Sequence, residues 1–249
     1  MAGTYLVSDV HGHLADLRER LRDAGLLAGE RWLGGDDGQA TLWVLGDLVD
    51  RGPEGLGVVR LLRSLQQQAP DRVHVLLGNH EALMLGERLF PRTGFSELWL
   101  RNGGRVEDQD GLTDDDVAWL QGLPAMGRTG EDLLVHSDTV AYLQWGDSVE
   151  QVNSHVAAVL AGNDPQRHYE VFAALTERYD FLGADGPEQA RRMLDAFGGS
   201  RVVHGHSIIA TLVNRPSAEV TEPYAYADGL VLGIDGGRYD GGPLLLVRS

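Results

Sequence analysis

The chain has 249 residues, no cysteine, and a formal net charge of −16 with only 21 Lys and Arg. Its length and average apolar content predict one soluble α/β domain over residues 1–249. The lack of cysteine excludes disulfides, thiolate metal sites and cysteine nucleophiles, and is typical of a cytoplasmic protein, which is the expected location. The acidic charge argues against a nucleic-acid partner, and no apolar run is long enough to predict a membrane partner.

The first third of the chain repeats one pattern, in which a short apolar strand ends in a polar loop and a helix follows. The expected elements are a strand over 4–8, a helix over 14–27, a strand over 40–45, a helix over 55–68 and a strand over 72–77. The polar loops are D9-V-H-G-H13, G46-D-L-V-D-R-G-P53 and G78-N-H-E81. Alternating strands and helices predict a parallel sheet, so the three loops are expected at the same edge, where ligands bind.

The rest of the chain adds two strands that end in histidine and a long segment between them. The expected elements are strands over 131–137 and 200–206, helices over 149–160 and 168–179, and closing strands over 230–237 and 242–248. Residues 138–199 are mostly helical in pattern, and we expect them to form a cap-like insertion.

Oxygen and imidazole side chains gather at the ends of the expected strands. Such ligands, drawn from separate loops, suit hard or borderline divalent ions such as Mn²⁺, Fe²⁺ or Zn²⁺. The number of ligands fits two ions, with Asp47 as a bridge because a carboxylate has two oxygens. The expected ligands are Asp9, His11 and Asp47 for the first ion and Asp47, Asn79, His136 and His206 for the second.

Three further residues in the same loops suit phosphoryl chemistry. Two adjacent ions can clamp a displacement at phosphorus and lower the pKa of a bridging water so that it attacks as hydroxide. His80 is placed to protonate the leaving oxygen as a general acid, and Asp50 to orient its ring and raise its pKa. Arg51 is expected to bind phosphate oxygens bidentately.

The motifs that carry these residues resemble the ordered signature of the calcineurin-like metallophosphoesterases, specifically the phosphoprotein phosphatase branch. They are S8-D-V-H-G12, G46-D-L-V-D-R-G52, G78-N-H-E81, L134-V-H136 and H204-G-H206. That branch includes bacterial serine/threonine phosphatases and symmetrical diadenosine tetraphosphate hydrolases. The resemblance implies a four-layer α/β/β/α sandwich, a site with two divalent metal ions, most often Mn²⁺ with Fe or Zn as alternatives, and the residue roles given above.

Two parts of the sequence depart from that pattern or leave it open. After His136 the chain reads S137-D-T-V140, where the family usually has a small A-G or G-G pair. The branch also usually supplies a second phosphate-binding arginine before its last motif, and the candidates are Arg191, Arg192 and Arg201. Arg201 and His204 are assigned with Arg51 to substrate binding, although His204 is equally consistent with packing beside His206.

The expected activity is metal-dependent hydrolysis of phosphomonoesters, either phosphoserine and phosphothreonine in proteins or small phosphorylated metabolites. The alternative is a dinucleoside polyphosphate hydrolase that cleaves diadenosine tetraphosphate symmetrically. A non-catalytic scaffold is disfavoured because no ligand or acid is missing from the set. The motifs specify the phosphoryl chemistry, whereas residues 138–199 are expected to select the leaving group. Substrate, native metal pair and oligomeric state are not specified by the sequence.

Overall fold

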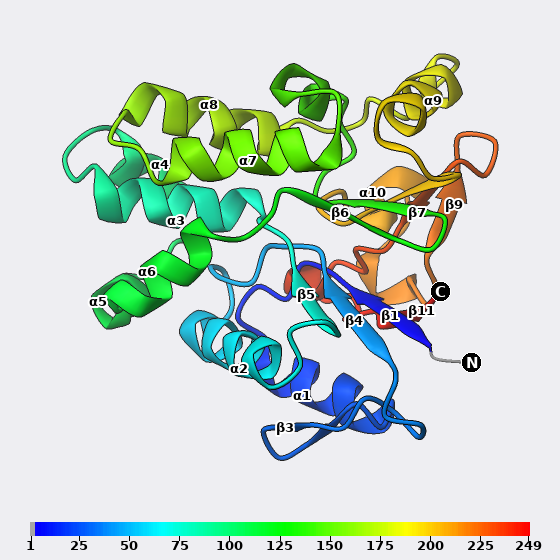
Figure 1. Cartoon of the computed structure of the whole chain (residues 1–249), viewed down its shortest axis with the longest axis horizontal. Coiled ribbons are helices and arrows are strands. Elements are labelled where there is room, and N and C mark those ends of the chain that lie inside the picture. The colour runs from blue at the N-terminus through cyan, green and yellow to red at the C-terminus, as the bar shows by residue number, and fades with distance from the viewer. Residues whose placement is uncertain (1–2) are drawn as a thin grey trace.

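The structure, a computed structural model, describes residues 3–249 and consists of two facing β-sheets with helices on both outer sides (Figure 1). The strands are β1 (Thr4–Val7), β2 (Leu27–Ala28), β3 (Arg31–Trp32), β4 (Thr41–Val44), β5 (Val73–Val75), β6 (Met126–Thr129), β7 (Asp132–Val135), β8 (Arg201–His204), β9 (Tyr224–Tyr226), β10 (Val231–Gly233) and β11 (Val247–Arg248). The α-helices are α1 (Leu14–Asp23), α2 (Gly55–Gln68), α3 (Asn79–Leu89), α4 (Phe95–Arg101), α5 (Val106–Gly111), α6 (Asp114–Gln121), α7 (Val149–Leu160), α8 (Pro165–Thr176), α9 (Gly186–Phe197) and α10 (Ile209–Val213). Short 3-10 helices are η1 (Ala141–Trp145), η2 (Ser217–Glu219) and η3 (Arg238–Asp240).

Both sheets have a parallel centre. The first has the strand order β11-β1-β4-β5, in which β1, β4 and β5 run parallel, as the sequence predicts, and β11 is antiparallel. The second has the order β6-β7-β8-β10-β9, with β7, β8 and β10 parallel between two antiparallel edge strands. The parallel strands of each sheet therefore end at one edge, which is where their polar loops gather.

The two sheets pack face to face through one apolar layer. Its buried residues are Leu6, Leu45, Leu76, Leu134, Val203, Leu232 and Ile234. Side chains alternate across a strand, so Leu6 lies between the sheets while its neighbour Val7 packs on the helical side. Helices α1 and α2 cover the outer face of the first sheet, and α7 and α9 cover the second (Figure 1). The layers are those of the predicted α/β/β/α sandwich.

Several element boundaries differ from the sequence prediction. The loop expected over 78–81 is the start of α3, which begins at Asn79 with Gly78 as its N-cap. The helix expected over 168–179 is α8, which starts earlier because the side chain of Asp164 accepts hydrogen bonds from two backbone N–H groups of its first turn. Helix α8 ends at Thr176, so residues 177–180 leave the helix.

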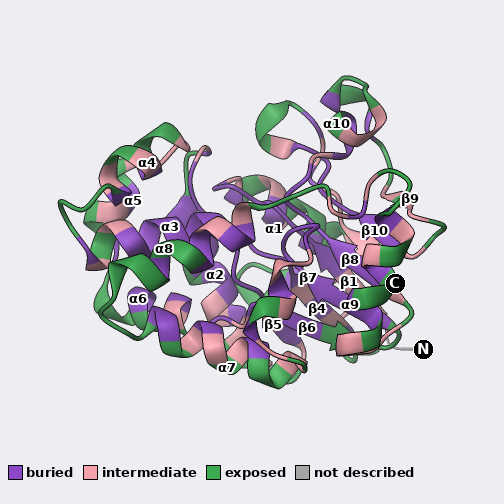
Figure 2. Ribbon diagram, turned by 90° about the horizontal axis from the view of Figure 1, so that it is seen from above, coloured by how far each residue is buried: buried purple, intermediate pink, exposed green. Residues whose placement is uncertain are grey.

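The segment between β7 and β8 contains η1, α7, α8 and α9, in agreement with its mostly helical pattern. Helix α8 packs along α3 on the side of α3 that faces away from the first sheet (Figure 1). Figure 2 shows buried positions along α3 and the strands, and exposed positions on the outer helices. Within residues 3–249, no helix is long and apolar enough to cross a membrane. The single-domain assignment stays a prediction.

Candidate active site

Close backbone contacts bring together the loops that follow β1, β4 and β5. The N–H of Asp9 donates to the carbonyl of Gly46 at 3.2 Å, and the N–H of His11 donates to that of Asp47 at 2.9 Å. A Cβ atom at Gly46 would lie only 2.6 Å from the backbone nitrogen of Gly78, so this approach requires glycine. Residues of motifs that are far apart in sequence are thereby brought into a single cluster at the edge of the sheet.

The carboxylate of Glu81 joins the loops that follow β4 and β5. One oxygen accepts hydrogen bonds from the N–H groups of Asp47 and Gly78, both at 2.9 Å. The other accepts from Leu48 at 2.7 Å and Val49 at 3.2 Å. Four otherwise unpaired buried N–H groups are satisfied by one side chain, so Glu81 supports the geometry of the loops.

Six non-glycine residues of the cluster have left-handed backbone conformations. They are Asp9 (φ 48°), His11 (φ 42°), Asp47 (φ 53°), Asp50 (φ 64°), Arg51 (φ 64°) and His206 (φ 62°). This conformation costs about 1–2 kcal/mol per residue, and such strain concentrates at functional sites, where the surrounding structure maintains it. The strain indicates that the fold holds these side chains in place for chemistry.

Donor atoms from separate strands meet around Asp47. Its carboxylate belongs to two buried groups whose donor atoms lie within 4.8 Å of one another, one with His11 and His80 and the other with His136 and His206. Asp9 Oδ1 lies 3.9 Å from His11 Nε2. Asp47 is the residue common to both groups.

Hydrogen bonds to backbone carbonyls orient two of the histidines. His11 Nδ1 contacts the carbonyl oxygen of Val49 at 3.0 Å, and His136 Nδ1 contacts that of Leu45 at 2.7 Å. A ring whose Nδ1 donates in this way presents its Nε2 lone pair, which is the usual arrangement of a metal-binding histidine. The amide oxygen of Asn79 lies 2.9 Å from His136 Nε2, in the same part of the cluster.

Asp235 is a buried carboxylate beside Asp9 and Asp47 that was not predicted. Burial raises the pKa of Asp9 well above its usual value, and the nearby carboxylates of Asp235 and Asp47 raise it further. Burial likewise raises the pKa of Asp235 to about 7. Carboxylates at this depth need cations beside them, so two divalent ions fit both the donor atoms and the charge of the site. Asp235 follows an apolar strand in I234-D-G-G237, the same signal that marks the other loops.

A hydrogen-bonded chain runs from His80 to the outside of the cluster. His80 Nδ1 lies 2.7 Å from Asp50 Oδ2, and the indole N–H of Trp99 donates to Asp50 Oδ1 at 2.9 Å. Burial disfavours the charged ring, but Asp47 and Asp50 outweigh it and raise the pKa of His80. No atom within residues 3–249 hydrogen-bonds to its Nε2, which is 3.9 Å from Asp47 Oδ2. A buried imidazole held at one nitrogen and free at the other is suited to proton transfer.

Two arginines bring positive charge to the cluster. The guanidinium of Arg51 lies 3.9 Å from the ring centre of Tyr239, and its Nη1 is 2.9 Å from His11 Nε2. Arg178 follows α8 in the insertion, next to Thr176, whose carbonyl accepts a hydrogen bond from His206 Nε2 at 3.1 Å. Burial lowers the pKa of His206, and the nearby charge of Arg178 acts in the same direction. The sequence does not single out Arg178 because it falls near the end of the helix predicted over 168–179.

The structure contradicts the assignment of Arg201 and His204 to substrate binding. Arg201 begins β8, at the opposite end of the strand from the cluster, and its guanidinium is bound by both oxygens of Asp132 at 2.8 and 2.9 Å. His204 Nδ1 contacts the carbonyl of Gly205 at 2.7 Å, and its Nε2 contacts the hydroxyl of Tyr226 at 2.8 Å. Both ring nitrogens of His204 therefore already have hydrogen-bond partners within the protein.

The two remaining arginine candidates also lie elsewhere. Arg191 and Arg192 belong to α9, where Arg191 is 3.7 Å from Asp228 and Arg192 donates to Gln189 at 2.6 Å. Both side chains are on the exposed surface of that helix. None of the three predicted candidates therefore lies at the cluster, whereas Arg178, which was not among them, is close enough for its charge to act on His206 and Asp235.

Comparison with known proteins agrees with this geometry. The sequence model of the calcineurin-like phosphoesterases matches residues 4–209. The chain belongs to this family. The symmetrical bis(5'-nucleosyl)-tetraphosphatase of Proteus mirabilis (strain HI4320) is 32% identical over 147 residues, which are 57% of this chain and 46% of that protein. The calcineurin-like phosphoesterase described here thus matches about half the length of this curated relative.

Two solved structures share the fold of this calcineurin-like phosphoesterase. A cold-active protein-tyrosine phosphatase of Shewanella sp. aligns with a TM-score of 0.72 and 18% identity, covering 100% of this chain and 75% of that chain. A putative diadenosine tetraphosphatase aligns with a TM-score of 0.53 and 21% identity, covering 100% of this chain and 94% of that chain. At these identities the likeness concerns the fold alone.

Proposed function

We propose that this calcineurin-like phosphoesterase is a divalent-metal-dependent phosphatase that hydrolyses phosphomonoesters of proteins or small metabolites. The observation that carries the proposal is the buried His80–Asp50 pair beside the Asp47 donor groups, with His80 Nε2 free to meet a leaving oxygen. An alkoxide is a poor leaving group, so a proton donor at this position is what a monoester requires. We keep the cytoplasm as the proposed location.

Two divalent ions are proposed to bind in the cluster, with Mn²⁺ as the first candidate and Fe or Zn as alternatives. The proposed ligands are Asp9, His11 and Asp47 for one ion and Asp47, Asn79, His136 and His206 for the other. When bound, the ions would neutralise phosphate charge and acidify the attacking water. Asp235 Oδ2 is without a hydrogen-bond partner in the described chain and lies among these ligands, where it can accept a hydrogen bond from a bound water.

The remaining roles follow from position and charge. Arg51 and Arg178 are proposed to bind non-bridging phosphate oxygens. Arg51 comes from the loop after β4 and Arg178 from the insertion. This local positive charge is needed because the whole chain has a formal net charge of −16, which repels anions at long range. Asp50 is proposed to keep the proton on Nδ1 of His80, so that Nε2–H donates to the leaving oxygen.

A second candidate function is symmetrical hydrolysis of diadenosine tetraphosphate. It is favoured by the name of the curated relatives, symmetrical bis(5'-nucleosyl)-tetraphosphatase, which is shared by a protein of Pectobacterium atrosepticum that is 35% identical over 147 residues. This reaction cleaves a phosphoanhydride and yields ADP rather than inorganic phosphate. The same metal ligands and arginines serve either reaction, so the products distinguish them.

The test is product analysis with the Mn²⁺-loaded protein. Substrates are a phosphothreonine peptide, a nucleoside monophosphate, a sugar phosphate and diadenosine tetraphosphate, with inorganic phosphate and ADP measured separately. A chelator-treated sample and the His80→Asn variant are the controls. Phosphate release that needs both metal and His80 supports the proposed phosphatase. ADP from diadenosine tetraphosphate, with slow turnover of every monoester, supports the second candidate instead.

A further inference from the structure

The loop S137-D-T-V140, which departs from the family pattern, is buried directly beside the cluster. Ser137, Asp138 and Thr139 are fully buried. The Asp138 carboxylate accepts a hydrogen bond from the hydroxyl of Ser207 at 2.5 Å and another from the backbone N–H of Tyr179 at 3.0 Å. Ser207 directly follows His206, and Tyr179 directly follows Arg178. One carboxylate therefore ties the last ligand loop to the segment that carries Arg178.

A second set of contacts holds the same segment from its other end. The carboxylate of Asp180 accepts from the hydroxyl of Thr139 and from the N–H of Val140, both at 2.8 Å. The N–H of Asp180 donates in turn to the carbonyl of Asp138 at 3.1 Å. Residues 138–140 and 179–180 are thus connected in both directions, although about forty positions separate them in sequence.

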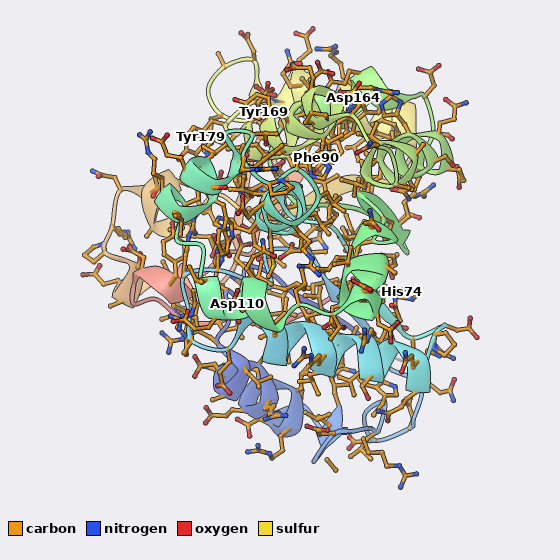
Figure 3. The ribbon with its side chains drawn as sticks, turned by 90° about the vertical axis from the view of Figure 1, so that its left-hand side faces the viewer. His74, Phe90, Asp110, Asp164, Tyr169 and Tyr179 are labelled. Carbon is orange, nitrogen blue, oxygen red and sulfur yellow. The ribbon has the colours of Figure 1, made fainter. Side chains whose placement is uncertain are left out.

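Arg178 lies between two anchored neighbours. Before it, the carbonyl of Thr176 accepts from His206 Nε2, and after it, the N–H of Tyr179 is bound by Asp138. Tyr179 has a φ of 75°, a left-handed conformation that a bulky side chain rarely adopts and that the surrounding contacts must maintain. Figure 3 marks Asp164 and Tyr179, the residues that flank α8 on either side. Arg178 itself is exposed and makes no salt bridge within residues 3–249 that would fix its guanidinium.

We propose that Asp138 is a positioning residue for phosphate binding, which holds the backbone at Tyr179 so that Arg178 points its guanidinium into the metal cluster. The proposal rests on the proposed function, because it takes phosphate as the ligand of Arg178. An exposed arginine on an unanchored segment would sample many orientations. Its conformational entropy would then be lost on phosphate binding, which would weaken the affinity. The departure S137-D-T-V140 is then the device by which the helical insertion is attached to the site.

The experiment measures binding of inorganic phosphate to the Mn²⁺-loaded protein by calorimetry, which requires no turnover. Asp138→Asn keeps the shape of the side chain but removes one of its two acceptors. The variant is expected to raise the Kd for phosphate about tenfold, as the loss of a charge-assisted hydrogen bond does. Arg178→Ala is expected to raise it by at least as much. The double variant is expected to equal Arg178→Ala alone, because Asp138 acts through that residue.

Two further variants separate positioning from stability. Asp180→Asn breaks the second set of contacts and is expected to weaken phosphate binding, with no further effect in the Arg178→Ala background. This variant keeps the proposal testable if Asp138→Asn fails to fold. Asp116→Asn is the matched control. This buried carboxylate on α6 is paired with Arg60 at 3.1 Å and Arg63 at 2.9 Å, both on α2. The control variant is expected to lower the Tm while leaving the Kd for phosphate unchanged.

The outcomes are distinguishable from those of the proposed function. Four outcomes would each overturn the positioning role. They are an unchanged Kd in both Asp138→Asn and Asp180→Asn, effects of these variants that add to that of Arg178→Ala, a loss of bound Mn²⁺ from these variants, and failure of the wild type to bind phosphate. A wild type that binds phosphate through Arg178 and Asp138 but hydrolyses no substrate would refute the phosphatase and support the positioning role.

Discussion

The loops at the strand ends and the helical insertion contribute to the site in different ways. The loops carry the proposed metal ligands and the proton donor, and they are connected by short backbone hydrogen bonds and by Glu81. The insertion contributes Arg178 and the carbonyl of Thr176, on a segment held by hydrogen bonds of the Asp138, Thr139 and Asp180 side chains and of the Val140 N–H. In the proposed function, the loops therefore supply the chemistry and one phosphate contact, through Arg51, and the insertion adds a second phosphate contact through Arg178.

The largest effect is expected where both proposed ions share a ligand. Asp47→Asn should lower activity by more than about 10⁴-fold, because metal binding supplies several kcal/mol of transition-state stabilisation. Elemental analysis should show substoichiometric metal in the purified variant. Full metal occupancy in Asp47→Asn would contradict its bridging role and weaken the distinction between the two regions.

The proton donor should depend on the leaving group. His80→Asn is expected to lower kcat by about 10²–10³-fold for an alkyl phosphate, because the leaving alkoxide must be protonated. For p-nitrophenyl phosphate the loss should be much smaller, since p-nitrophenolate leaves without a proton. Equal losses for the two substrates, measured under metal saturation, would remove the general-acid role.

The insertion should affect binding more than chemistry. Arg178→Ala is expected to raise KM for a monoester roughly tenfold or more, the effect of one hydrogen bond to a charged group, with a smaller change in kcat. Arg167→Ala, an exposed position on α8, is the matched control and should change neither constant. A loss confined to kcat would show that the insertion takes part in the chemical step.

Trp99 should have a moderate effect through Asp50. Trp99→Phe keeps the aromatic ring but removes the N–H that donates to Asp50 at 2.9 Å. One net hydrogen bond is worth about 1 kcal/mol, so kcat for an alkyl phosphate should fall about fivefold. In the His80→Asn background the same substitution should have no further effect, and an additive loss would place Trp99 outside the proton-donor chain.

The smallest effect concerns stability of the packing between the insertion and α3. Burial between Phe90 and Phe95 lowers the pKa of His168, whose Nε2 donates to the carbonyl of Ala82 at 2.7 Å. The unfolded chain binds a proton below about pH 6.5 and the folded chain does not, so stability should fall as pH decreases from 7 to 5. His168→Gln should flatten this slope in urea unfolding, and an unchanged slope would contradict the assignment.

Local patterns in the sequence were sufficient for the parallel strands and for the loops that follow them. A short apolar strand followed by a polar loop that contains Asp or His is a short-range signal, and parallel strands end at a common edge of the sheet. The convergence of Asp9, Asp47 and His136 therefore follows from strand order. Their left-handed loops and the strain within them are not visible in composition or periodicity.

The arginines show what local pattern cannot decide. Arg201 and His204 belong to the same four-residue strand, yet Arg201 lies at the end away from the cluster, because each residue of a strand advances the chain by about 3.3 Å. Arg178 lies near His206 because α8 ends at Thr176, whose carbonyl accepts a hydrogen bond from that histidine. The backbone after Arg178 is held by Asp138, about forty residues earlier in the chain.

The sequence by itself therefore determined the family signature, the parallel sheet and the types of ligand, since these depend on residues that are near one another along the chain. The tertiary structure alone decided that Asp235 and Trp99 lie beside the predicted site residues, that Arg201 lies at the far end of its strand, and that S137-D-T-V140 is hydrogen-bonded to the segment after α8. The physical reason is that hydrogen bonds and burial between distant segments set these positions, and no local propensity encodes them.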